Sequence, residues 1–268
     1  MRVAVSTTHR LHLSAENAVC ELHPLGFNDI QLGLPHYNAD LDNLVRIRDW
    51  LGLTYTVHGP FPAERGFICN AAAVDDSVFE KTRGIFTSTL ENAGRLGAGL
   101  VVFHVAEPGH ENSLESSIEM FKLLAGKAEK EDMVVCVENK MPNSDVGFSP
   151  DDIRRLLEEV GSDHLGICFD TGHAIASMGS ERKALDFMDS FKEQIRDVHI
   201  VPGTYEWDVA TPPQLEPHFY RGVVRILDGV GYPGNLTIEA VPEIPDTELV
   251  RGSQYLRATI VEHYQNKM

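Results

Sequence analysis

The stretch Leu165-Gly166-Ile167-Cys168-Phe169-Asp170-Thr171-Gly172-His173 passes from apolar residues directly to a carboxylate and an imidazole. Its apolar part predicts a buried strand, and Thr171-Gly172 predicts a turn between Asp170 and His173. A polar group beside an apolar core is costly unless it is paired or binds something. The same arrangement recurs along the chain, which indicates a repeated structural unit with polar side chains at its strand ends.

Six predicted strands close on a histidine or an acidic residue. They lie at residues 54–58, 100–104, 133–138, 165–170, 196–199 and 236–239, and they end at His58, His104, Glu138, Asp170, His199 and Glu239. Two further strands are predicted nearer the N-terminus, at 2–7 and 29–34. Apolar residues at helical spacing predict intervening helices near 14–23, 40–51, 75–96, 113–130, 149 onward, 181–194, 219–231 and 247–264.

Eight alternations of a short apolar strand with a helix predict a parallel sheet covered by helices. In a chain of 268 residues, this pattern favours a closed (β/α)8 barrel over an open doubly wound sheet. The glycine-rich phosphate-binding motifs of open nucleotide-binding sheets do not follow any predicted strand. We expect a single domain over residues 1–268, with its active site at the C-terminal ends of the strands.

The amino-acid composition limits the classes of molecule that the protein is expected to bind. The formal net charge of −17 argues against a nucleic-acid partner, because phosphate binding normally requires a basic surface. Apolar residues make up 43% of the sequence, but they form no run long enough to span a membrane. The four cysteines are widely spaced, and the N-terminus starts directly with a predicted strand in place of an apolar leader. These features predict a cytoplasmic protein.

In a closed barrel, the polar strand ends meet at one mouth. Carboxylates and imidazoles crowded there would repel one another or change protonation unless cations neutralised them. Mixed histidine and carboxylate ligands suit zinc, manganese or iron(II). Alone, a strand-end histidine is more often structural than a ligand, and Glu138 and Glu239 could form structural ion pairs. The joint occurrence of these residues predicts a site for one or more divalent metal ions. Its expected core is Glu138, Asp170, His199 and Glu239.

Several neighbouring residues are candidates for additional contacts. His173 follows the sixth predicted strand, and His218 follows the long segment after the seventh. Asn139 and Lys140, which follow Glu138, could contact substrate, although a solvated lysine is an equally good interpretation. Trp207 could stack on a sugar or could pin its own segment to the barrel rim.

The strand-end motifs resemble those of the xylose-isomerase-like TIM barrels. The motifs are Thr56-Val57-His58-Gly59-Pro60-Phe61, Phe103-His104, Val137-Glu138-Asn139, Phe169-Asp170-Thr171-Gly172-His173, Val198-His199 and Ile238-Glu239. They occur in order over nearly the whole chain. This superfamily includes sugar and sugar-phosphate isomerases and epimerases, and also endonuclease IV.

The resemblance to the epimerase branch implies roles for individual residues. Glu138, Asp170, His199 and Glu239 match its metal ligands, and the two glutamates match the groups that move a proton on and off the substrate carbon. His173 matches a position behind the ligands or in contact with substrate. Members of this branch often carry an arginine shortly after the seventh-strand histidine; residues 201–205 lack one, and Arg221 is a candidate replacement.

The resemblance to endonuclease IV implies further metal ligands. His58 and His104 would join Glu138 on a second metal, and His173, His218 and Glu216 would hold a third. The Asp-x-His pair of that branch is Glu216-Pro217-His218 in this chain, and the glycine-rich run that usually follows is absent.

Two enzymatic hypotheses follow. The first is a divalent-metal isomerase or epimerase of a sugar, sugar phosphate or related polyhydroxy carbonyl compound, with Glu138 and Glu239 as base and acid. The second is a multi-metal phosphodiesterase of the endonuclease IV kind, which the extra histidines favour and the acidic charge disfavours. A metal-binding barrel without turnover is a third interpretation. The sequence leaves open the substrate, the metal and whether the barrel is a monomer or a homo-oligomer.

Overall fold

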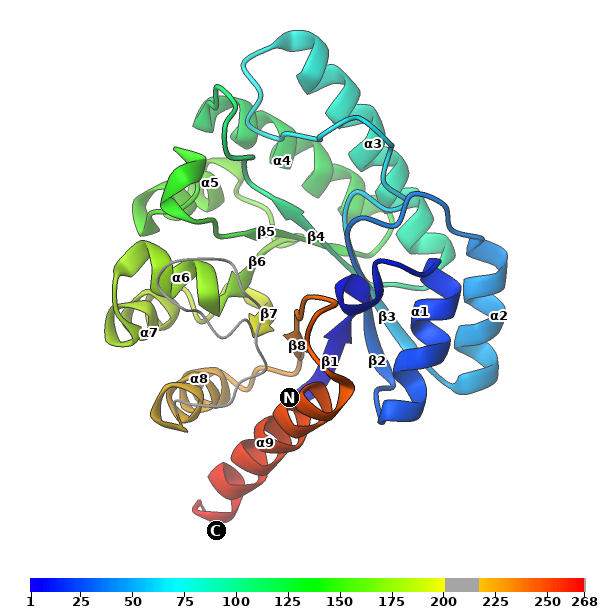
Figure 1. The fold of residues 1–268 in the computed structure, drawn as a ribbon. Helices are drawn as coiled ribbons and strands as arrows, with labels where there is room; N and C mark the ends of the chain where they lie inside the picture. The colour runs from blue at the N-terminus through cyan, green and yellow to red at the C-terminus, as the bar shows by residue number, and fades with distance from the viewer. Residues whose placement is uncertain (201–216, 268) are drawn as a thin grey trace.

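Eight parallel strands form a closed barrel in the computed structural model, which describes residues 1–200 and 217–267. The strands follow one another around the barrel in chain order, and β1 pairs with β8 to close it. Helices surround the strands on the outside (Figure 1). The predicted (β/α)8 fold is therefore confirmed.

The strands are short and largely buried, as the apolar runs in the sequence predict. Their bounds are β1 Arg2–Ser6, β2 Asp29–Leu32, β3 Thr54–His58, β4 Leu100–His104, β5 Val134–Glu138, β6 Leu165–Asp170, β7 Ile195–Ile200 and β8 Asn235–Ile238. Five of the six polar strand ends are the last or next-to-last residue of a strand, and Glu239 directly follows β8. All of these residues consequently lie at the C-terminal rim of the barrel.

A helix follows each strand, and two helices, α6 and α7, lie between β6 and β7. The bounds of the helices are α1 Ala15–Leu22, α2 Leu41–Leu51, α3 Asp76–Arg95, α4 Leu114–Lys130, α5 Pro150–Val160, α6 Thr171–Met178, α7 Glu181–Ser190, α8 Pro217–Gly229 and α9 Asp246–Gln265. Short 3-10 helices cover Thr7–Arg10, His23–Leu25 and Pro142–Ser144. No helix in the described part of the chain is both long and apolar enough to cross a membrane.

The segment after β6 differs from the prediction. Thr171-Gly172 begins helix α6 and does not form an isolated turn. The Asp170 side chain caps this helix by accepting a hydrogen bond of 2.7 Å from the His173 backbone N–H. Aspartate is a strong N-cap, and its effect outweighs the low helix propensity of the glycine that suggested a turn. Asp170 and His173 are thus held on either side of the first turn of a helix.

Buried apolar side chains form two clusters in the barrel. The larger cluster lies between the strands and the surrounding helices and includes Phe103, Phe121 and Phe169. Val102, Cys136 and Cys168 form a small cluster of their own. Cys136 and Cys168 are free, buried thiols.

Candidate metal centre

The four residues of the expected metal core lie together at the barrel mouth. Ligand-type atoms of Glu138, Asp170, His199 and Glu239 all lie within 4.8 Å of one another. β5, β6 and β7 supply the first three, and the chain just after β8 supplies the fourth. Parallel pairing places Asp170 opposite His199 on adjacent strands. The register of the barrel alone thus gathers residues that are about 100 positions apart in the chain.

His199 faces this group with one ring nitrogen. Its Nδ1 lies 3.1 Å from Glu239 Oε2 and 3.9 Å from Asp170 Oδ2. Its Nε2 points the other way and lies 3.9 Å from Asp197 Oδ2. The imidazole therefore offers Nδ1 to the cluster and Nε2 to a second carboxylate behind it.

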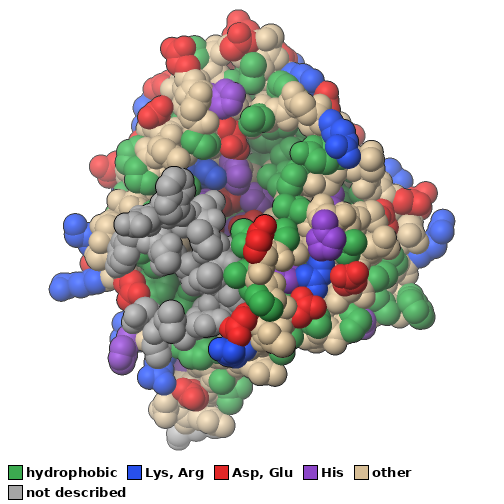
Figure 2. Space-filling view, in the orientation of Figure 1, with side chains coloured by type: hydrophobic (Ala, Val, Ile, Leu, Met, Phe, Trp, Pro, Cys, Tyr) green, Lys and Arg blue, Asp and Glu red, His purple; other side chains and the backbone are tan. Residues whose placement is uncertain are grey.

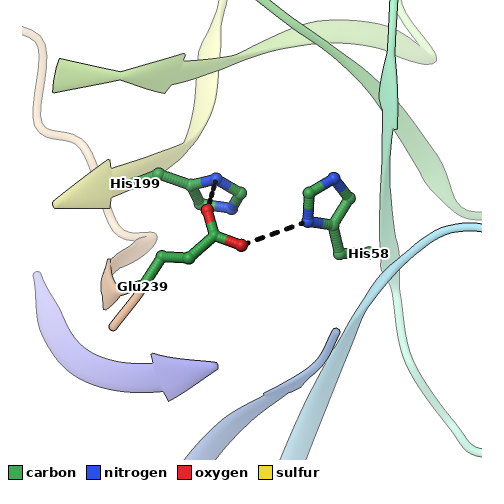
Figure 3. Close-up of side chains that lie close together, drawn as sticks. All are labelled: His58, His199 and Glu239. Carbon is green, nitrogen blue, oxygen red and sulfur yellow. Dashed lines mark ion pairs between the residues drawn. The ribbon is translucent and has the colours of Figure 1, made fainter. Parts of the chain in front are cut away.

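His58 connects the two glutamates. Its Nε2 lies 3.2 Å from Glu138 Oε2, and its Nδ1 lies 3.7 Å from Glu239 Oε1. Figure 3 shows Glu239 between His58 and His199, with a carboxylate oxygen directed at each ring. His104 Nε2 lies 3.5 Å from Glu138 Oε2 on the other side. His58, His104 and Glu138 thus form a second group with ligand-type atoms within 4.8 Å of one another.

Several buried atoms in these groups lack hydrogen bonds within the described residues. They are both ring nitrogens of His58 and of His199, Glu138 Oε2 and Asp170 Oδ2. Their closest approaches have the length of ion pairs but not the directions of hydrogen bonds. Buried polar atoms without partners are costly and need an explanation. A divalent cation among them would satisfy these atoms, and three carboxylates with one imidazole suit zinc, manganese or iron(II).

The electrostatics of the group also suit a cation. Burial raises the pKa of Glu138, but His104, His173 and His58 outweigh burial and hold this pKa well below its ordinary value. The pKa of Glu239 is lowered in the same way, because His199 and His58 outweigh its burial. Burial raises the pKa of Asp170 to about 6. In return, Glu239 and Glu138 outweigh the burial of His199 and raise the pKa of its imidazole to about 10.

His173 and Asn139 hold the ends of β5 and β6 together. Asn139 is fully buried, and its amide makes paired hydrogen bonds with the Asp170 backbone, donating to the carbonyl at 3.1 Å and accepting from the N–H at 2.8 Å. His173 Nδ1 lies 2.9 Å from the Asn139 carbonyl oxygen and 3.2 Å from Glu138 Oε1. The Asn139 amide thus positions Asp170, and a contact of Asn139 with substrate stays a prediction.

Sequence reasoning missed two carboxylates that orient the histidines. Glu107 lies 2.6 Å from His104 Nδ1, and Asp197 lies behind His199. Asp197 is buried and accepts hydrogen bonds from Gln31 of β2 at 2.9 Å and Thr237 of β8 at 3.3 Å. Asp197 precedes His199 by two residues in one strand, so strand alternation places both on the same face. That spacing was the available signal for Asp197, and an acid three residues after His104 was the signal for Glu107.

Other predicted residues lie away from this group. Arg221 is exposed on α8 and pairs with Glu262 of α9 at 3.3 Å, and the His218 side chain is also exposed. Glu216 and Trp207 fall outside the described residues. Among the residues that the structure does describe, the ligand-type groups do not include His218.

A pocket of about 230 Å³ opens above the cluster. Its polar wall contains His58, His104, Glu138, His173 and Glu239, together with Lys140. Its apolar wall contains Leu11, Leu34 and the segment after Glu239. Figure 2 shows this hollow at the mouth, with purple histidine and red acidic side chains beside green hydrophobic ones.

Comparison with known proteins identifies the family. A family model described as "Xylose isomerase-like TIM barrel" matches residues 20–259. The chain belongs to the xylose isomerase-like TIM barrel family. This membership confirms the resemblance in the strand-end motifs and agrees with the closed barrel.

The chain is similar to proteins of two kinds, a probable endonuclease and sugar epimerases. A probable endonuclease 4 from Carboxydothermus hydrogenoformans is 26% identical over 135 residues, covering 49% of this chain and 47% of that protein. The chain therefore spans about half the length of this curated relative. A D-tagatose 3-epimerase-like protein has a similar fold, with a TM-score of 0.85, 20% identity and full coverage of both chains. A D-psicose 3-epimerase has a TM-score of 0.79 at 15% identity, covering 97% of this chain and 99% of its own.

Proposed function

We propose that this protein is a divalent-metal-dependent isomerase or epimerase of a sugar, a sugar phosphate or a related polyhydroxy carbonyl compound. The observation that carries the proposal is the group Glu138, Asp170, His199 and Glu239, whose ligand-type atoms lie within 4.8 Å of one another beneath a pocket. Structural similarity to sugar 3-epimerases over the full chain supports it.

The pocket suits a small polar ligand with a reacting centre at its floor. Glu138 ends β5 and Glu239 directly follows β8, so they reach the ligand from different parts of the barrel wall. A bound divalent ion would polarise a carbonyl and an adjacent hydroxyl and so acidify the neighbouring C–H bond.

Glu138 and Glu239 are the groups that would move the proton. Both carboxylates are ionised at neutral pH and so can accept a proton from carbon. In an isomerisation, the glutamate that receives the proton returns it to the neighbouring carbon. In an epimerisation, the other glutamate must enter the step protonated and deliver its proton to the opposite face of the same carbon, and the first glutamate is left protonated. His58 and His199 contact Glu239 from two sides and hold its carboxylate in place.

Proton exchange in deuterated water tests this function. The protein is stripped with a chelator, reloaded with Mn²⁺, Zn²⁺ or Fe²⁺, and incubated with neutral, carboxylated and phosphorylated ketoses. We expect deuterium to enter at a carbon next to the carbonyl, together with formation of an isomer or epimer. Absence of exchange with every metal and sugar, in protein shown by elemental analysis to carry metal, would count decisively against the proposal.

A phosphodiesterase of the endonuclease IV kind is the second candidate. The group His58, His104 and Glu138 favours it, because this group could hold an additional metal ion. The similarity to a probable endonuclease 4 also favours it. Two or more metal ions per chain together with catalytic cleavage of DNA containing abasic sites would establish this function in place of the first. The formal charge of −17 is the main argument against a DNA substrate.

A further inference from the structure

Lys140 is an unusual residue in the wall of the pocket. Its side chain is only 7% exposed, and it lines the cavity above the carboxylates. Within the described residues, its ammonium makes no ion pair or hydrogen bond. Lysine is rarely buried to this extent without a partner, because removing its charge from water is costly. A buried, unpaired cation directed into a pocket indicates a ligand of opposite charge.

The backbone around Lys140 is fixed. Its N–H donates to the Gly147 carbonyl at 3.0 Å, and its carbonyl accepts from Ser177 Oγ at 2.9 Å. These bonds tie the residue to the segment before α5 and to α6. The position of the side chain is therefore built into the fold, so the ammonium does not lie at the end of a free loop.

A nearby acid accounts for Lys140 only in part: against the burial of Glu107, His104 and then Lys140 lower the pKa of this carboxyl, but Lys140 makes no hydrogen bond or ion pair with it. Glu107, the carboxylate on the same side of the mouth, is already paired with His104 at 2.6 Å. Lys140 makes no ion pair with Glu107 or with Glu138 within the described chain. Three carboxylates, those of Glu138, Asp170 and Glu239, gather beneath the pocket. An anionic ligand would be repelled there unless a separate cation received its charge.

We propose that Lys140 is the subsite for an anionic group, a carboxylate or a phosphate, at the far end of a polyhydroxy carbonyl substrate. This inference rests on the proposed function and narrows its substrate class. Lys140 follows Glu138 by two residues, so their Cα atoms lie within about 7 Å of each other. The lysine side chain extends away from this point, so an anionic group that binds its ammonium lies a few carbons away from the carbon that reacts at Glu138. A sugar acid or a sugar phosphate carries an anionic group at such a distance, whereas a neutral sugar has no charge to pair with the ammonium.

Three ketoses with the same carbon skeleton test whether the pocket prefers an anionic ligand, and whether it prefers a carboxylate or a phosphate. D-fructose is neutral, D-fructuronate carries a carboxylate at carbon 6, and D-fructose 6-phosphate carries a phosphate there. Calorimetric titration of the Mn²⁺-loaded protein gives a dissociation constant for each. We expect at least one anionic ketose to bind about tenfold or more tightly than D-fructose. The tighter of the two anions identifies the group that the pocket accepts.

Substitutions test whether Lys140 is the cause of the preference for an anionic ketose. Lys140→Met should reduce the ratio of anionic to neutral affinity to near one, and Lys140→Arg should retain most of it. Lys183→Met, on the exposed face of α7, removes a charge elsewhere and should leave the ratio unchanged. The proposal is overturned if the wild type shows no preference for either anion, if it binds none of the three, or if Lys140→Met keeps the preference.

Deuterium exchange distinguishes failure of the Lys140 proposal from failure of the proposed isomerase or epimerase function. Exchange into a ketose without any anionic preference would leave the isomerase or epimerase standing and remove the role of Lys140. Anionic preference that depends on Lys140, without exchange into any sugar, would retain the subsite and remove the proposed reaction.

Discussion

Two residues behind the candidate metal ligands show how single side chains position the residues of this group. Asp197 lies on the Nε2 side of His199, opposite the cluster, and is held by Gln31 of β2 and Thr237 of β8. A carboxylate in this place orients a ligating imidazole and increases its basicity. Asn139 plays a corresponding part for Asp170 through its paired backbone hydrogen bonds.

Replacing Asp197 by asparagine should weaken metal binding without removing any ligand. We expect Asp197→Asn to lower the affinity for Mn²⁺ or Zn²⁺ by roughly 10- to 100-fold, the usual effect of losing a carboxylate behind a metal-bound histidine. Competition with a chromophoric chelator measures this affinity directly. Glu262→Gln, at an exposed ion pair with Arg221, is the matched control and should bind metal as the wild type does. Wild-type affinity in Asp197→Asn would show that Asp197 does not position His199.

At the residue scale, sequence reasoning located the polar strand ends but not the side chains that support them. Glu138, Asp170 and His199 stand out because each interrupts or ends an apolar run. Asp197 lies within a strand and has no motif of its own, and its role depends on Gln31, which is 166 positions away in the chain. Contacts of that separation are fixed by barrel closure and cannot be derived from spacing.

At the scale of elements, the junction of β6 and α6 combines structural and chemical roles in one residue. Asp170 ends the strand, caps the helix with one carboxylate oxygen, and directs the other oxygen, buried and without a hydrogen bond, toward the cluster. The two oxygens can therefore be tested separately, because asparagine caps a helix as well as aspartate does but lacks its negative charge.

Asp170→Asn should separate folding from metal binding. We expect the metal-free variant to melt at or above the temperature of the metal-free wild type, since α6 keeps its cap and a buried charge is removed. Its affinity for a divalent metal should fall sharply. Asp170→Ala should lose the cap as well, at a cost of about 1 kcal/mol in the free energy of unfolding. Thermal unfolding and metal titration of both variants provide the measurements; an Asp170→Asn variant as unstable as Asp170→Ala would contradict this division of roles.

The elements themselves were largely predictable. Ser14 and Ser149 cap α1 and α5 as their positions in the sequence indicate, and Pro150 occupies the first turn of α5. The extent of α7 was less predictable: it ends at Ser190, short of the expected Gln194. α6 was missed because Thr171-Gly172 has a poor helix propensity, and only the cap from Asp170 reveals the helix.

At the scale of the whole molecule, the barrel gathers charges that the unfolded chain would keep apart. Glu138 and Asp170 are buried in the folded protein with unpaired oxygens, and a cation that binds them binds the native state alone. Metal binding and folding stability are consequently linked.

Addition of metal should stabilise the protein. At a free metal concentration 100 times its dissociation constant, the expected gain in the free energy of unfolding is about 2.7 kcal/mol. Urea unfolding of chelator-treated protein, with and without Mn²⁺, measures this gain. Mg²⁺ at the same concentration is the control and should have a smaller effect, because its coordination does not favour imidazole. Equal stability with and without Mn²⁺ or Zn²⁺ would refute the metal centre.

The central claim is that Glu239 moves a proton at the substrate carbon of a metal-loaded enzyme. The most direct measurement is deuterium incorporation from solvent into the substrate, by nuclear magnetic resonance, for wild type and Glu239→Gln at saturating metal. The glutamine retains an oxygen that can contact a metal but cannot accept a proton from carbon. We predict that exchange falls by about 10²- to 10⁴-fold, while the melting temperature and bound metal stay close to those of the wild type. Undiminished exchange in Glu239→Gln would contradict the account.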